Sequence, residues 1–521
     1  MADKVAVAHR DELRSKNEER SERDAEQGPA KKDQDAAPIL DAMRVNNDEH
    51  VLEKSIPTHN KGKAAPKIAL ELFGEGLYRN DVALLAGVDN RHESWQVRTT
   101  AEELFAEAVG ADQTLFSTNG STTSVHTALH TVTRPGEKIV VSRNSHMSVI
   151  TGLVLCGASP VWVIPEYDEE LEIAHGVTAA AVGSALDDNP DAVAAMIVTP
   201  TYYGVSADVR AIADECHRRD LPLVTDDAWG LAYWFHAGLP PSAIESGADF
   251  AIGSVHKTIG GLGQTSVMST KGDRIDQTRL TLSLELFEST SVSAVLLASI
   301  DAARHQMVHR GQELIGRSLE LVGKLREELT SIEGLRVITE ADVMRSAGAF
   351  AFNPQHLTVD LTGLQITGFE AADWLRDQRK IDVELAEHRR VMMMVSIGDD
   401  EESVKRTVEA FTALSEAHRQ GKRSDIFPEM PTPMHLRTEQ AMTPRDAFFA
   451  PVESTPLRDS VGRIGTEFIT PYPPGIPVLV PGELITPAIV DYLDLVAAAG
   501  GLIQGSGDST LRQVRVVEKA A

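Results

Sequence analysis

The feature that most constrains this chain is an alternation of short apolar runs and helical patterns between about residues 100 and 270. The apolar runs are predicted to be buried strands: KIVVS (138–142), VWVIP (161–165), AAMIVTP (194–200), LPLVTDD (221–227) and FAIGS (250–254). Between the third and fourth runs, Val209, Ile212 and Cys216 share one face of a predicted helix. Repeated strand–helix–strand units with apolar strands predict an α/β fold with a mostly parallel sheet covered on both faces. Ligands of such open sheets bind beyond the carboxyl ends of the strands.

The length of 521 residues exceeds what one hydrophobic core usually organises, so several domains are expected. We predict a flexible charged tail over residues 1–40, a large domain over 41–305, an α+β domain over 306–420 and a C-terminal domain over 421–521. The tail consists mainly of charged and small residues, which bury too little apolar surface to offset the entropy of ordering.

Two patterns mark the last two domains. Apolar residues from Leu314 to Ile332 predict a long amphipathic helix that ends at Gly334. The proline-rich segment TPYPPGIPVLVPGE (470–483) predicts an extended path, because proline fixes the backbone and excludes a helix.

Composition narrows the class of protein. Hydrophobic residues make up 42% and charged residues 24%, values typical of globular proteins. A net charge of −27 argues against nucleic acid as a partner, because phosphate binding needs clustered cations. Cys156 and Cys216, the two cysteines, are too few for a disulfide framework or a zinc site, so no metal is expected. With no signal-like or membrane-spanning stretch, we expect a cytoplasmic protein.

A lysine and an aspartate stand at the ends of neighbouring predicted strands. Lys257, in SVHKTIGGLGQTS (254–266), follows the last strand directly, where desolvation favours an unprotonated amine that attacks a carbonyl. Asp226 ends the preceding strand, where a buried carboxylate needs a cation such as a protonated pyridine nitrogen. Ala228, on the same side, is small enough for a planar ring to lie against it. Taken alone, Lys257 and Asp226 also fit a surface lysine and a helix cap.

Two more clusters follow strands. STNGSTTSVHTAL (117–129) opens a helix at Gly120, where free backbone N–H groups, Ser121 and Thr122 form a phosphate cradle. SRNSHMSV (142–149) places His146 where its ring can lie flat on an aromatic cofactor. Each pattern alone is also typical of an ordinary helix start or a structural histidine. Their order at successive strand ends predicts a pyridoxal 5'-phosphate (PLP) site.

These motifs resemble those of the bacterial ornithine/lysine/arginine decarboxylases, PLP enzymes of fold type I, in the form without an N-terminal receiver-like domain. The matching segments run from IPTHNKG (56–62) through NGST, RNSH, PTYYG (200–204), DDAWG and SVHKT to PYPPGIPVLVPGE (471–483). The resemblance implies an aspartate-aminotransferase-like fold with a seven-stranded, mostly parallel sheet, and a homodimer with shared active sites. It also implies decarboxylation of lysine, ornithine or arginine, in polyamine biosynthesis.

The resemblance also assigns roles to individual residues. The implied catalytic residues are Lys257, which forms the Schiff base, His256, Asp226, which pairs with the pyridine nitrogen, and His146, which stacks on the ring. The other implied cofactor contacts are Ser121, Thr122, Ala228, Trp229 and Ser254, and the implied substrate contacts are Thr290 and Ser291 from the partner subunit. Lys257 or His256 is a candidate for returning a proton to the substrate Cα.

Two departures from the family pattern concern the substrate. Met147 replaces a lysine usually found after the stacking histidine, and TSVSA (290–294) stands where relatives commonly have TSPSY. The loss of an aromatic side chain there reshapes the predicted entrance, so the substrate is less determined than the cofactor. Transamination, oxygen-dependent oxidative deamination and a catalytically silent subunit remain alternatives.

Overall fold

The computed structural model describes residues 32–48, 54–83, 97–418, 436, 438–472, 476–498 and 502–519. The chain divides into two compact units, Met1–Ala36 and Ala37–Ala521, and every helix and strand named in this article belongs to the second. Residues 1–31 of the predicted tail lie outside the described residues.

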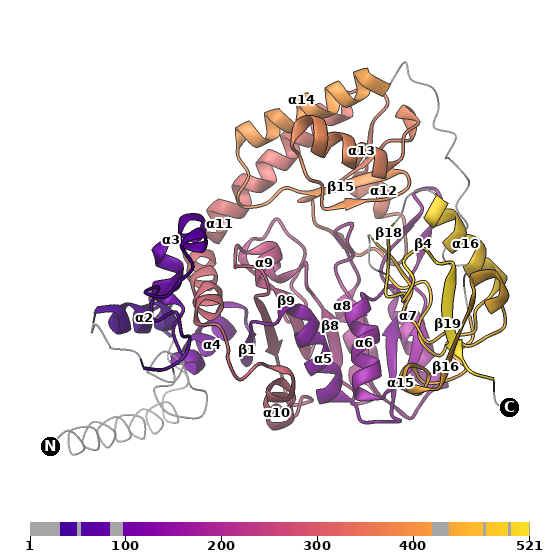
Figure 1. Cartoon of the computed structure of the whole chain (residues 1–521), viewed down its shortest axis with the longest axis horizontal. Helices are drawn as coiled ribbons and strands as arrows, with labels where there is room; N and C mark the ends of the chain where they lie inside the picture. The colour runs from indigo at the N-terminus through magenta and orange to yellow at the C-terminus, as the bar shows by residue number, and fades with distance from the viewer. Residues whose placement is uncertain are drawn as a thin grey trace. The chain divides into compact units, whose positions relative to one another are not determined.

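A seven-stranded sheet forms the centre of the second unit (Figure 1). Its strands, in spatial order, are β1 (Gln113–Ser117), β10 (Ser266–Thr270), β9 (Phe250–Ser254), β8 (Leu223–Asp226), β6 (Ala192–Val198), β2 (Lys138–Ser142) and β3 (Ser159–Val163). β10 runs antiparallel to its two neighbours, and the pairs from β9 to β3 are parallel. The predicted mostly parallel sheet is therefore confirmed, with strand bounds within two residues of the apolar runs.

Helices cover both faces of this sheet: α4 (Val97–Ala108), α5 (Gly120–Val132), α6 (Met147–Cys156), α7 (Ala179–Asp188), α8 (Val209–His217) and α10 (Gln277–Phe287). Alternation along the strands assigns the faces. Ile139 and Val141 of β2 pack in the cluster that contains α5, α6 and α10. Val140, between them, packs with α7 and α8. Because successive strand residues point to opposite faces, a strand buried on both sides reads as a continuous apolar run.

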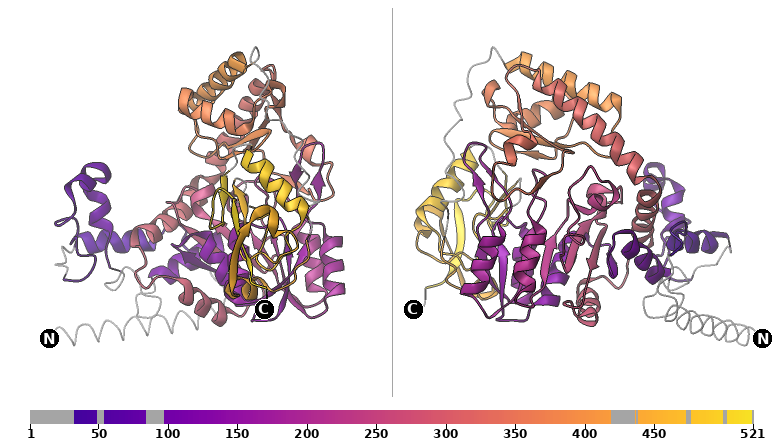
Figure 2. Two further views of the ribbon diagram at one scale, coloured as in Figure 1. Left: turned by 45° about the vertical axis from the view of Figure 1, so that its right-hand side comes forward. Right: turned by 180° about the vertical axis from the view of Figure 1, so that it is seen from behind.

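The next part of the chain is a smaller α+β layer. Its sheet has the order β11 (Arg336–Val337), β13 (His356–Asp360), β15 (Arg390–Met394) and β14 (Leu385–Ala386), and all of its pairs are antiparallel. The helices that accompany it are α11 (Ala294–Thr330), α12 (Glu340–Val343), α13 (Gly368–Trp374) and α14 (Glu401–His418). Figure 2 shows α11 and α14 running alongside one another. The predicted long helix exists, but it begins well before Leu314 and runs through the proposed boundary at 305, which stays a prediction.

The C-terminal part has its own apolar core, which includes Leu457, Ile469, Ile489 and Leu493. Its elements are α15 (Pro444–Phe449), β16 (Val452–Pro456), β17 (Thr470–Tyr472), α16 (Pro487–Ala498), β18 (Leu502–Gln504) and β19 (Gln513–Val517). The proline-rich segment begins as β17, and its residues 473–475 lie outside the described residues.

Two negative findings apply to the described ranges. None of the helices there has both the length and the apolar character that a bilayer crossing needs. No cluster of three metal-binding side chains was found in the same ranges. Cys156 and Cys216 are buried and form no disulfide bond.

Candidate active site

Lys257 lies at the carboxyl edge of the central sheet, on the short helix α9 (Val255–Thr258) that follows β9 without a linker. Its Nζ is 4.6 Å from the centroid of the Trp229 ring. Burial lowers the pKa of Lys257, and the charges of Asp226 and Glu384 offset this effect only in part. A lysine held in this way has more of the neutral, nucleophilic amine at pH 7 than a surface lysine.

Asp226 is the last residue of β8, the strand adjacent to β9. Its side chain is buried, and its Oδ1 accepts a hydrogen bond of 3.3 Å from the backbone N–H of Ala228. Burial raises the pKa of this carboxyl group, and Lys257 acts in the opposite direction. The sheet therefore brings Asp226, Ala228, Trp229 and Lys257 together, and it leaves a carboxylate that a buried cation would stabilise.

His146 follows β2 and caps the N-terminus of α6. Its Nδ1 accepts a hydrogen bond of 3.1 Å from the backbone N–H of Ser148, so the proton of the neutral ring is on Nε2. Burial, together with the charge of Lys257, lowers the pKa of His146 to about 4. The ring is therefore uncharged at pH 7.

Hydroxyl groups gather where α5 begins. Ser121 Oγ lies 2.5 Å from Ser254 Oγ and 3.1 Å from Ser266 Oγ. Gly120 has φ +78°, a conformation that favours glycine, and its N–H donates to the carbonyl of Gln264 at 2.8 Å. Free N–H groups at the start of a helix, with hydroxyls beside them, bind a phosphate group well.

His256, two residues after Ser254, is fixed by a hydrogen bond of one ring nitrogen. Its Nδ1–H donates to the carbonyl oxygen of Thr265 at 2.8 Å, which leaves Nε2 as a bare acceptor. Burial is the main cause that lowers the pKa of His256. His256 is thus a neutral group beside Lys257, able to hold or pass a proton.

The residues of this crevice fit PLP. Ser121, Ser254, His256 and the start of α5 would hold its phosphate, Asp226 its pyridine nitrogen and Lys257 its aldehyde carbon. The indole Nε1 of Trp229 is buried with no hydrogen-bond partner among the described residues, as expected of a donor that faces a bound group.

The roles assigned from the sequence did not include three residues of the crevice: His356, Glu384 and Tyr202. His356 begins β13, its Nδ1–H donates to the carbonyl of Tyr202 at 2.8 Å, and its ring centroid is 5.4 Å from that of Trp229. Glu384 precedes β14 and acts electrostatically on Lys257. No sequence signal identifies His356 or Glu384, whereas Tyr202 lies in the PTYYG motif. Each of them comes from a different segment of the chain.

Some predicted contacts lie away from the centre of this crevice. Thr122 is exposed on the first turn of α5. Thr290 and Ser291 are exposed in the segment before α11. Their predicted role belongs to the active site of a partner subunit, so it stays a prediction.

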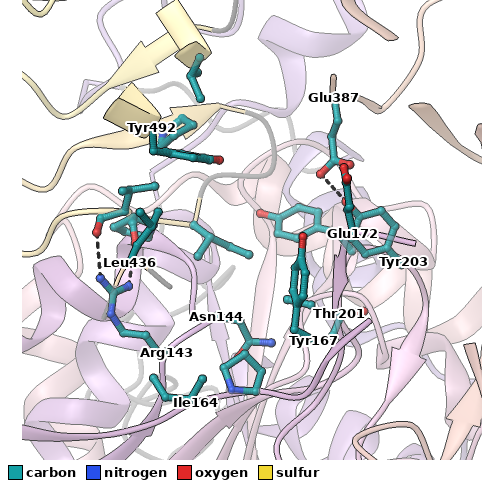
Figure 3. Close-up of a pocket in the computed structure, with 18 of the residues that line it drawn as sticks. Arg143, Asn144, Ile164, Tyr167, Glu172, Thr201, Tyr203, Glu387, Leu436 and Tyr492 are labelled. Atoms are coloured by element: carbon teal, nitrogen blue, oxygen red, sulfur yellow. Dashed lines mark hydrogen bonds between the residues drawn. The ribbon is translucent and has the colours of Figure 1, made fainter. Parts of the chain in front are cut away.

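A cavity of about 420 Å³ lies beside this crevice and does not include Lys257 in its lining (Figure 3). It opens at the carboxyl ends of β2 and β3, between Arg143 and Ile164. Glu387, from the turn after β14, and Tyr492, from α16, also line it. Asn144, two residues before His146, also lines this cavity.

The architecture and the Lys257 crevice define a PLP enzyme of fold type I. The model of the Orn/Lys/Arg decarboxylase major domain matches residues 37–403, and that of the C-terminal domain of the same family matches residues 429–505. The chain therefore belongs to the Orn/Lys/Arg decarboxylase family, which confirms the resemblance drawn from its motifs.

Curated relatives span most of the chain. An arginine decarboxylase of Halalkalibacterium halodurans is 36% identical over 93% of this chain and 98% of its own length. An arginine decarboxylase of Bacillus subtilis is 35% identical over 93% of this chain and 99% of its own length. The constitutive lysine decarboxylase of Escherichia coli is 24% identical over 85% of this chain and 75% of its own length.

Solved structures agree on the fold. The structure of the Escherichia coli constitutive lysine decarboxylase superposes with a TM-score of 0.77 and 22% identity, and it covers 93% of this chain and 82% of its own. A lysine decarboxylase of Pseudomonas aeruginosa gives the same TM-score of 0.77 at 20% identity, over 92% of this chain and 80% of its own. At these identities the agreement concerns the fold alone.

Proposed function

We propose that this chain is a PLP-dependent decarboxylase of basic amino acids, with arginine as its preferred substrate. The observation that carries the proposal is a partly buried lysine of lowered pKa, Lys257, which lies on the ring of Trp229 and within the field of Asp226 at the sheet edge. The choice of arginine is supported by the higher identity to relatives named arginine decarboxylase, 36% and 35%, than to one named lysine decarboxylase, 24%.

Each residue contributes a distinct part of the reaction. PLP, when bound, supplies the electron sink that accepts the electron pair left on Cα as CO₂ departs. Asp226 holds the proton at the pyridine nitrogen, because a buried carboxylate favours the cationic ring. Lys257 would hold the cofactor, and its amine would be placed to return a proton to the substrate Cα, with His256 as the alternative donor.

Further features of the proposal concern assembly and location. We infer a homodimer, because α3 (Lys67–Asn80) has no buried residue and exposes Ile68 and Leu72. An exposed apolar helix face of this kind is typical of a subunit interface. The exposed Thr290 and Ser291 would then reach the active site of the partner. A cytoplasmic location and a role in polyamine biosynthesis complete the proposal.

A product analysis tests the proposed reaction. The purified protein with PLP is incubated separately with arginine, ornithine and lysine, and CO₂, amine, keto acid and peroxide are measured. We expect CO₂ and amine in equal amounts, fastest with arginine, and none from Lys257→Ala. Keto acid without CO₂ would overturn the proposal.

A further inference from the structure

The cavity beside the Lys257 crevice is built by three parts of the chain. The large domain contributes Arg143, directly after β2, and Tyr167 of the short strand β4 (Tyr167–Asp168); the small sheet region contributes Glu387, and the C-terminal part contributes Leu436 and Tyr492 (Figure 3). Its volume of about 420 Å³ lies within the range of small-molecule sites. A ligand there would contact all three parts at once.

The arginines of the cavity wall already have partners. Arg143 Nη2 is 3.1 Å from Glu483 Oε2, and its Nη1 donates to the carbonyl of Pro477 at 2.7 Å. Arg389 Nη2 is 3.1 Å from a carboxylate oxygen of Glu172. The cavity therefore presents little free positive charge to an anion.

Arg390 also lines the cavity, and it too has a carboxylate partner. Its side chain is 2% exposed, and its Nε is 3.5 Å from a carboxylate oxygen of Glu387. The Nε and Nη1 atoms have no accessible surface and no hydrogen-bond partner among the described residues. This guanidinium therefore forms an ion pair with Glu387 at the cavity wall.

Glu387, in contrast, faces the open space. A fifth of its side chain (20%) stays accessible, and one carboxylate oxygen accepts a hydrogen bond from the Tyr203 hydroxyl. In Figure 3 the hydroxyls of Tyr167 and Tyr492 also turn toward the cavity. The charge of Glu387 helps to raise the pKa of Tyr203 and Tyr492, which places these phenols within its field.

Oxygen acceptors and aromatic faces around one carboxylate suit an organic cation. Carboxylate and phenol oxygens accept hydrogen bonds from an ammonium or guanidinium group, and aromatic rings attract its charge. Ile164, Val478 and Val496 supply apolar wall for a methylene chain. Because Arg143 and Arg389 pair with Glu483 and Glu172, an added cation would meet chiefly the Glu387 carboxylate, which it would share with Arg390.

We propose that this cavity is a second binding site, separate from Lys257, for an alkyl amine or alkyl guanidine cation. The identification of that cation with the product amine rests on the proposed function. Asn144 lines the cavity two residues before His146, so a bound cation contacts the turn that carries the stacking histidine.

Calorimetry on the PLP-loaded full chain, reduced with borohydride so that Lys257 is blocked, tests the site. Agmatine and 1,4-diaminobutane are the probes, and glutarate is an anionic control of similar size. We expect saturable binding of the amines, one per chain, and none of glutarate. Glu387→Gln should weaken binding about tenfold or more, because a charge-assisted contact is lost.

Two further measurements keep this test decisive. Tyr492→Phe removes one hydroxyl without changing shape, and we expect a loss of binding of about threefold. It replaces Glu387→Gln if thermal unfolding shows that the latter does not fold. No amine binding, or binding that neither substitution weakens, would overturn the second site. The decarboxylation assay is independent of this test. Activity without amine binding would contradict only the second site. Amine binding without activity would contradict only the proposed reaction.

Discussion

Two spaces at the carboxyl edge of the central sheet differ in how the cationic side chain in each is paired. At the ends of β8 and β9, Lys257 rests on the face of Trp229 and its pKa is lowered by burial. At the ends of β2 and β3, Arg143 is paired with Glu483 at 3.1 Å and with two backbone carbonyls. Both cations are partly buried at the edge of the same sheet, but only Arg143 has a full set of hydrogen-bond and ion-pair partners there.

The difference separates a reactive site from a binding site. A cation whose burial is only partly offset by nearby carboxylates loses its proton more easily, which makes Lys257 a nucleophile. A cation with a full set of partners stays charged and holds its neighbours in place. We therefore expect substitutions in the first space to affect chemistry and those in the second to affect stability and ligand binding.

The largest effect is expected from removal of the reactive amine. Lys257→Ala should lower the rate of CO₂ release by about a thousandfold or more, because the attacking group itself is lost. The variant should also lack the imine absorbance of the PLP-loaded protein. Lys271→Ala, in an exposed turn after β10, is the matched control, and it should keep the absorbance and the rate. A Lys257→Ala protein that still released CO₂ at a comparable rate would contradict the assignment of Lys257 as the reactive amine.

The next effect is expected from the carboxylate that faces Lys257. Asp226→Asn should lower kcat by about a hundredfold, because a neutral amide no longer stabilises the pyridinium charge. Asp208→Asn is the control: this aspartate caps α8 by accepting from Ala211 N–H at 3.0 Å, and asparagine caps equally well. Steady-state rates of both variants decide the matter, and equal rates would contradict the role of Asp226.

In the second space, a broken ion pair should reduce stability. Glu483→Gln leaves the largely buried Arg143 without its countercharge, so the free energy of unfolding should fall by about 2–3 kcal/mol. Asp494→Asn breaks an exposed pair with Arg458 in the same part of the chain and should cost less than about 1 kcal/mol. Urea unfolding of the two variants measures the difference. Equal losses would show that burial does not distinguish these pairs.

The smallest expected effect is on the stability of the protein at acidic pH. Burial lowers the pKa of His126, on α5, to about 4, whereas the unfolded chain takes up this proton near pH 6.5. The unfolded state therefore binds more protons as the pH falls from about 6.5 toward 4, and the free energy of unfolding falls with it. His126→Gln should lose less stability than the parent between pH 7 and pH 5, by about 2 kcal/mol. An identical pH dependence of the two unfolding midpoints would contradict this assignment.

The fold was predictable where a local pattern determines it. Strands buried on both faces appear as apolar runs, and the residues that follow them share one edge, so Asp226 and Lys257 could be placed together from the sequence. The start of α11 could not be placed in this way. Asp301 and Arg304 form a fully buried ion pair of 2.9 Å within that helix, and these charged residues interrupt its apolar periodicity.

The remainder of the two sites depends on contacts between distant segments. His356 and Glu384 reach the Lys257 crevice through the small sheet, and neither lies in a motif that the residue types identify. Arg143 and Glu483 are 340 positions apart, and only the docking of the C-terminal part onto the large sheet makes them a pair. Periodicity and spacing along the chain carry no information about such contacts.

The central claim is that the amine of Lys257 forms the covalent link to PLP. Reduction of the PLP-loaded protein with borohydride, followed by peptide mapping, tests it most directly. We predict one pyridoxyl label per chain, on the peptide that contains Lys257. A label on another lysine, or no label at all, would contradict it.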